Sequence, residues 1–160
     1  MEAEVGGLNV EIPIVAGFSS KNIPMIDLDN TSLEEVVVKS RIVAQRFKLG
    51  GFLVLRSSKD NYHVVFARKL PPRKALRAVA FFALLQNRKE TYVWFTLQVI
   101  KGSFTLRVSK KVSGDQVKPE PKPVYFEGIL GEGIREYLAA YKEINDMLGR
   151  LEKEEPAQNA

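Results

Sequence analysis

Residues 23–35 read Ile-Pro-Met-Ile-Asp-Leu-Asp-Asn-Thr-Ser-Leu-Glu-Glu, an apolar run followed by acids and then by a polar stretch. The short apolar run Ile23–Leu28 is typical of a buried β-strand. Thr31 and Ser32 each have a Glu three residues later, which is the pattern of a capping box at a helix start. Apolar residues then recur at helical spacing as far as Phe47, before two glycines. This stretch therefore predicts a strand that leads directly into a helix.

The rest of the chain predicts more strands and two more helices. Further strands are expected at Leu8–Ala16, Phe52–Arg56, Tyr62–Arg68, Thr91–Ile100 and Ser103–Ser109. Pro13 would hold the first of these at a sheet edge, and the turn-rich Ser57–Asn61 predicts a hairpin. Pro71-Pro72 opens a second helix over Arg73–Asn87, and a last helix with one apolar face is expected over residues 133–152.

The order of these elements predicts the fold class. From Ile23 it is strand, helix, strand, strand, helix, strand, which is the α+β, ferredoxin-like or RRM-like split βαβ plan. Its antiparallel sheet would carry both helices on one face and leave the other face free for a ligand. We expect one domain over residues 1–153, with a Pro-rich extended connector at 113–123 and a frayed tail at 154–160.

Composition limits the class of protein. No apolar stretch reaches the roughly 18 uncharged residues of a membrane span, and the acidic N-terminus does not resemble a secretory signal. The chain has no cysteine, so disulfides and thiolate metal sites are excluded. These features predict a cytoplasmic protein with no membrane partner.

The charge is distributed unevenly along the chain. Residues 1–38 have a net charge of −6 and residues 123–160 of −4, whereas residues 39–122 carry nineteen Lys or Arg against four acids, a net of +15. A basic centre of this kind favours a nucleic-acid partner, because each neutralised phosphate releases counterions. Arg73, Lys74 and Arg77 on the second helix are candidate phosphate contacts, although they could equally form a solvated helix face.

Two acids and the only histidine form the candidate site. Asp27 and Asp29 are one residue apart on a strand and so share a face. His63 lies on the third strand of this plan, which pairs beside the first strand, the one that carries the two acids, at the centre of the sheet. Carboxylates suit Mg²⁺ or Mn²⁺, and an imidazole could contact a triphosphate. Arg107, Lys110 and Lys111 could add positive charge, and Lys111 is also a candidate nucleic-acid contact. Alternatively, Asp29 is an acid that precedes a helix and is favoured there by the helix dipole, and His63 is an ordinary hairpin residue without a ligand.

Three motifs together resemble the archaeo-eukaryotic primase superfamily, over roughly residues 23–111. Pro24–Asp29 resembles its Asp-x-Asp motif, Ser57–His63 its small-residue-x-His motif, and Thr105–Lys110 a basic strand found in some members. The resemblance implies that Asp27 and Asp29 bind metal. It also implies that an incoming nucleoside triphosphate contacts His63, with Ser57, Ser58, Arg107 and Lys110 around it.

One element of the family pattern is missing. Family members carry a further Asp on the last core strand, whereas Thr91–Ile100, expected to match that strand, contains none. Three hypotheses follow. The first is a nucleic-acid-binding, catalytically degenerate primase-like protein that acts in replication of a plasmid, virus or archaeal genome, with DNA favoured over RNA. The others are an active metal-dependent nucleotidyltransferase and a DNA-binding regulator without a nucleotide site. We expect the apolar face of the last helix to cap the domain core, and a homodimer or a replication-protein partner is the alternative for that face.

Overall fold

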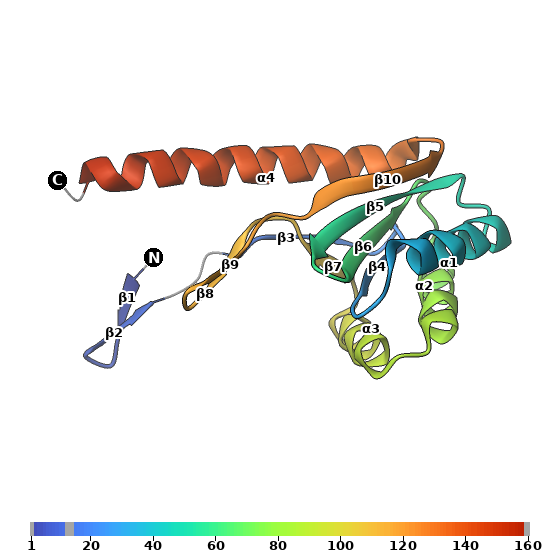
Figure 1. The fold of residues 1–160 in the computed structure, drawn as a ribbon, viewed down its shortest axis with the longest axis horizontal. Coiled ribbons are helices and arrows are strands. Elements are labelled where there is room, and N and C mark those ends of the chain that lie inside the picture. The colour runs from blue at the N-terminus through green and yellow to red at the C-terminus, as the bar shows by residue number, and fades with distance from the viewer. Residues whose placement is uncertain (1, 12–14, 159–160) are drawn as a thin grey trace.

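The computed structural model describes residues 2–11 and 15–158 (Figure 1). Its helices are α1 (Leu33–Arg46), α2 (Pro72–Gln86), α3 (Lys89–Lys101) and α4 (Gly131–Gln158). Its strands are β1 (Glu2–Val5), β2 (Leu8–Glu11), β3 (Gly17–Ser20), β4 (Met25–Leu28), β5 (Gly51–Ser58), β6 (Asn61–Phe66), β7 (Phe104–Arg107), β8 (Lys111–Ser113), β9 (Gln116–Lys118) and β10 (Lys122–Gly128).

The central sheet has the order β10-β5-β6-β4, and every neighbouring pair is antiparallel. Strand β4, helix α1 and the β5–β6 hairpin are arranged as the split βαβ plan requires, with β6 between β4 and β5. Strand β7 lies next to β4 and forms its own antiparallel pair with β3. The predicted α+β class with an antiparallel βαβ-type core is therefore confirmed.

Helices cover both faces of this sheet. Phe66 of β6 packs against Phe82 of α2, with ring centroids 6.2 Å apart, on the face that also carries α1. Figure 1 shows α4 running over the opposite face, where its buried Tyr137 meets Phe18 of β3 edge to face. The expectation of a free second face is therefore wrong in part. The apolar stripe of the last helix needs burial, and the second face of the sheet provides it.

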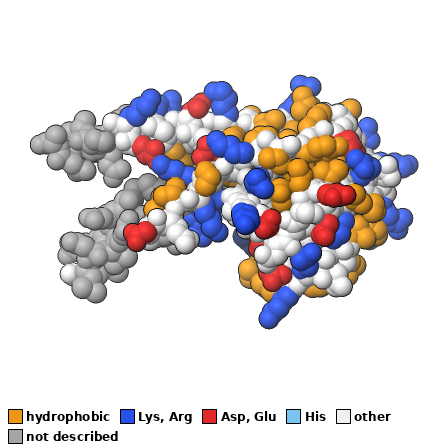
Figure 2. Space-filling model, viewed as in Figure 1, with side chains coloured by type: hydrophobic (Ala, Val, Ile, Leu, Met, Phe, Trp, Pro, Cys, Tyr) orange, Lys and Arg blue, Asp and Glu red, His pale blue; other side chains and the backbone are white. Residues whose placement is uncertain are grey.

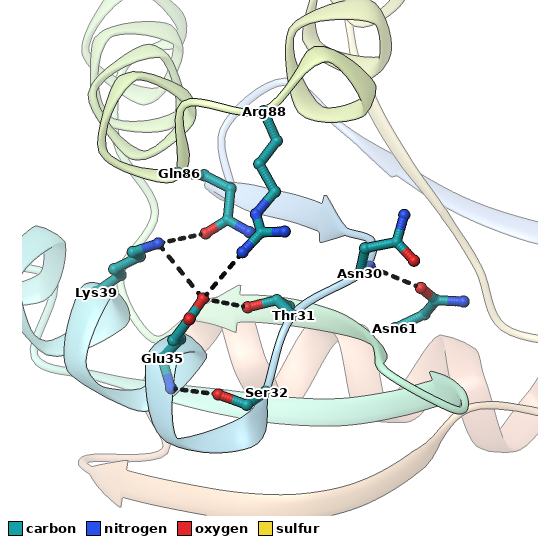
Figure 3. A network of polar contacts seen from close by, with 8 residues as sticks. All are labelled: Asn30, Thr31, Ser32, Glu35, Lys39, Asn61, Gln86 and Arg88. Atoms are coloured by element: carbon teal, nitrogen blue, oxygen red, sulfur yellow. Dashed lines mark hydrogen bonds and ion pairs between the residues drawn. The ribbon is translucent and has the colours of Figure 1, made fainter.

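The start of α1 is fixed by the polar network in Figure 3. Ser32 is the N-cap, and its hydroxyl accepts a hydrogen bond from the Glu35 backbone N–H at 3.2 Å. The Glu35 carboxylate accepts from the Thr31 hydroxyl at 2.9 Å and pairs with Arg88 at 3.4 Å. The side-chain oxygen of Asn61, the first residue of β6, accepts a hydrogen bond from the backbone N–H of Asn30. These contacts confirm the predicted helix start and fix the position where the chain leaves β4.

The predicted strand at Thr91–Ile100 is wrong, because these residues form most of helix α3. Their β-branched and aromatic residues favoured a strand, yet the side chains facing the core follow a helical spacing. Thr91 and Gln98 are buried, and Trp94 and Phe95 are partly buried between them. Gln98 also accepts a hydrogen bond from the Thr105 backbone N–H at 2.8 Å, which ties α3 to β7. Trp94 and Phe95 therefore pack against the hydrophobic core.

Three other segments differ from expectation. Residues 113–123 contain the turn and second strand of the β8–β9 hairpin and the start of β10, which pairs with β5. Residues 154–158 of the expected tail continue α4, and the expected strand at Leu8–Ala16 is described only in part, as β2. Pro13 lies outside the described residues. Among the described helices, none has the length and apolar character needed to span a bilayer.

Candidate functional site

Asp27 and His63 are brought together as predicted. They are direct cross-strand partners in the β4–β6 ladder, so their side chains lie on the same face of the sheet. His63 Nε2 is 3.6 Å from Asp27 Oδ1. The imidazole is almost fully buried, whereas 30% of the Asp27 side chain is exposed. Asp27 is therefore the member of this pair that a ligand can reach.

The two aspartates and the histidine differ in their charge states. Burial, together with the nearby carboxylate of Asp29, raises the pKa of Asp27 to about 7. Burial also raises the pKa of Asp29, although the positive charge of Lys118 opposes the shift. Burial and the positive charge of Arg107 lower the pKa of His63 to about 3. At neutral pH His63 is therefore uncharged, and Asp27 is protonated in a large share of molecules.

Arg107 is the positive group fixed beside these residues. Its guanidinium donates to three backbone carbonyls: Nη1 to Ser109 at 2.5 Å and Pro119 at 3.0 Å, and Nη2 to Ser57 at 3.1 Å. Those carbonyls belong to the end of β5, the segment after β7 and the segment before β10. Arg107 therefore lies beside Asp27 and His63. Most of the donor capacity of Arg107 is nevertheless used inside the protein.

The other predicted nucleotide contacts lie less favourably. Ser57 is buried at the end of β5, and Ser58 receives a hydrogen bond from the Asn61 side-chain amide inside the hairpin turn. Lys110 forms an ion pair with Glu152 of α4. Lys111 is exposed in β8. The structure therefore brings His63 and Arg107 to Asp27, while Ser58 and Lys110 are engaged elsewhere.

The donor set for a metal ion is small. Among the described residues, no three His, Asp or Glu side chains lie close enough to hold an ion together. Asp27 and Asp29 would be the protein ligands of a bound Mg²⁺ or Mn²⁺, with water or phosphate oxygens supplying the rest. Such an ion would meet the positive charges of Arg107 and Lys118, both of which already act on Asp27. This charge balance favours a site without a resident metal.

A second group of basic residues lies away from this pair. Lys74 and Arg77 of α2 line a hollow of about 290 Å³ together with Arg46, Lys48, Phe47 and Leu70. Arg73 lies on the neighbouring side of α2 and lines a different, more apolar hollow with Leu76 and Phe104. Arg46 and Lys48 were not among the basic residues predicted from the sequence. The Arg-Phe-Lys run at the end of the first predicted helix was the available signal.

Comparisons with protein-family models, with curated proteins and with solved structures gave no match for this chain.

Proposed function

We propose that this protein binds nucleic acid on a primase-like scaffold that has lost nucleotidyl transfer, and that it acts in the cytoplasm in DNA replication of a mobile element or an archaeal genome. The order of strand, capped helix and hairpin supports the primase-like part, as does the pairing of Asp27 with His63. Loss of catalysis is supported by Arg107. Strand β7 lies beside β4, and its Arg107 places a positive charge next to Asp27, where a bound metal ion would have to sit.

The observation that supports nucleic-acid binding is the excess of positive charge that remains after ion pairing. Of the nineteen Lys and Arg in residues 39–122, six are in an ion pair within the part of the chain that the structure describes: Lys39, Arg41, Lys69, Arg88, Lys110 and Lys122. In Figure 2 Lys and Arg side chains are spread over the visible face among fewer acids. A surface of this kind attracts a polyanion and favours phosphate contacts, which read no base sequence.

An active Mg²⁺- or Mn²⁺-dependent nucleotidyltransferase is the second candidate, and one observation favours it. Asp27 and Asp29 are close enough for their charges to repel each other, and a divalent cation would relieve that repulsion. Mn²⁺ would then raise the thermal unfolding midpoint of the wild type at pH 8 but not that of Asp27→Asn. A wild type that also incorporates labelled nucleotide would replace the degenerate assignment with the catalytic one.

Salt dependence of binding tests the main proposal. Fluorescence anisotropy would be measured with labelled single-stranded DNA, double-stranded DNA and RNA of equal length, at several salt concentrations. Contacts to three or four phosphates predict that log K falls with log salt concentration with a slope of about −2 to −3 for a single strand. A slope near zero, or no binding at low salt, would refute the proposal. Competition by a nucleoside triphosphate would separate a primase-like protein from a DNA-binding regulator with no nucleotide site.

A further inference from the structure

The hollow between α1 and α2 is lined mainly by positive charge. Arg46 and Lys48 come from the end of α1 and the loop after it, and Lys74 and Arg77 come from the first two turns of α2. All four side chains are exposed, and Phe47 and Leu70 complete the lining. Neither Asp nor Glu lines the hollow. Its volume is about 290 Å³, enough to admit a phosphate group.

No acidic side chain among the described residues neutralises these four cations. None of the four is in an ion pair with a residue that the structure describes. Four like charges around one hollow create a positive local potential, which attracts an anion. Helix α2 adds to this imbalance, because it has no acid in its first turn and no side-chain cap. Lys74 therefore lies near the positive end of a helix dipole, where a negative group is the favoured neighbour.

The loops that form the hollow are fixed in place. Arg68 donates from its backbone N–H to the Leu49 carbonyl at 3.1 Å, and from its side chain to the Lys48 carbonyl at 3.0 Å. Arg46 lies over the Phe81 ring, with its guanidinium carbon 5.5 Å from the ring centroid. Binding an anion here would therefore cost little ordering of the backbone, which favours affinity.

We propose that this hollow, defined by Arg46, Lys48, Lys74 and Arg77, is a binding site for the phosphodiester backbone of a nucleic acid. The inference rests on the proposed function and adds the surface that performs it. Arginine forks can bind phosphate oxygens in pairs, and lysines act as mobile point charges. The site lies on the side of the sheet covered by α1 and α2, opposite the face that carries Asp27 and His63. Nucleic acid therefore binds without the primase-like pair.

The test compares two charge-matched double variants. Lys48→Gln/Lys74→Gln removes two cations from the hollow. Lys59→Gln/Lys89→Gln removes two exposed lysines elsewhere, in the β5–β6 turn and at the start of α3. All four lysines are exposed, so both variants should keep the unfolding temperature of the wild type. Anisotropy with a labelled single-stranded oligonucleotide gives the affinity and the salt slope of each.

Loss of two phosphate contacts should reduce the magnitude of the salt slope by about 1.4 and weaken binding about 25-fold near 0.1 M salt. The Lys59/Lys89 control should bind within about threefold of the wild type. Equal affinities for the two variants, or a larger loss in the control, would overturn the hollow as the site. Nucleic-acid binding by the protein would stand in either case.

A second measurement separates this inference from the proposed function. Inorganic phosphate would be titrated into isotope-labelled protein while amide resonances are followed by NMR. Shifts confined to residues 46–48 and 70–77, and absent in Lys48→Gln/Lys74→Gln, would support the anion site even if no nucleic acid bound. If these shifts appear but no nucleic acid binds, the proposed function is wrong while the anion site stands. Phosphate shifts located elsewhere, or no shifts at all, would overturn the site.

Discussion

Replacement of Asp27 by Asn should stabilise the protein at alkaline pH. Asp27 has an ordinary pKa of 3.8, and burial together with Asp29 raises its pKa to about 7 in the folded state. Between these values the folded state binds more protons than the unfolded state, so this group makes stability fall as the pH rises. At pH 8 the folded protein must hold a charged, poorly solvated carboxylate, and the amide of Asn removes that cost.

The size of the effect follows from the two pKa values. A difference between 3.8 and about 7 corresponds to about 4 kcal/mol once the pH exceeds 7. Since 30% of the side chain is exposed and water screens part of the interaction, about 2–4 kcal/mol is expected. The gain should shrink toward zero near pH 3, where the wild-type carboxyl is already neutral in both states.

His63 has the opposite dependence on pH. Burial lowers its pKa from 6.5 to about 3, so the unfolded state binds more protons across that window and stability rises with pH. From about pH 4 to 6.5 the contributions of Asp27 and His63 therefore oppose each other, and their sum changes little in the wild type. Asp27→Asn removes one of them, so its stability should increase from pH 4 to 6.5.

Urea unfolding at pH 4, 5.5, 7 and 8 measures these changes. Asp29→Asn is the matched control, because Asp29 is less buried than Asp27 and should give a smaller gain at pH 8. A loss of 1 kcal/mol or more in Asp27→Asn at pH 8 would refute the reasoning. It would mean that the carboxylate is held as a favourable partner of Arg107 and that burial is the smaller effect.

Three further changes have expected outcomes. His63→Gln removes the opposing contribution of His63, so the free energy of unfolding measured in urea should fall from pH 4 to 7. A rise over that range would contradict this prediction. Arg107→Lys cannot reproduce the fork that reaches three carbonyls, and calorimetry should show a loss of about 2–4 kcal/mol. Ser32→Ala should cost about 1 kcal/mol by removing the N-cap, whereas Ser32→Asp should retain most of it.

Local signals predicted the centre of the fold. The strand at β4, the cap at Ser32 and the Ser57–Asn61 hairpin each depend on residues within a few positions of one another. Helix α3 was missed because Tyr92, Val93 and their neighbours have a high preference for strands. Tertiary contacts override that preference, and the spacing of Thr91, Trp94, Phe95 and Gln98 was the helical signal to weigh against it.

The sites could be predicted only in part for the same reason. Pairing of Asp27 with His63 follows from the order of strands, and the sequence supplied that order. The anchoring of Arg107 depends on carbonyls of Ser57 and Pro119, which are distant in sequence and carry no side-chain signal. The basic hollow likewise needs residues 46–48 and 70–77 to meet, a contact that only the packing of α1 against α2 creates.

The two sites should act independently, since they lie on opposite faces of the sheet. Variants without shared partners usually have additive effects within about 0.5 kcal/mol. Combining Asp27→Asn with Lys48→Gln/Lys74→Gln should therefore keep the altered pH dependence of the first and the reduced salt slope of the second. Asp27→Asn alone should leave the salt slope unchanged. A slope altered by Asp27→Asn would mean that nucleic acid reaches the Asp27 face, and the hollow between α1 and α2 would then be no more than one part of a longer binding track.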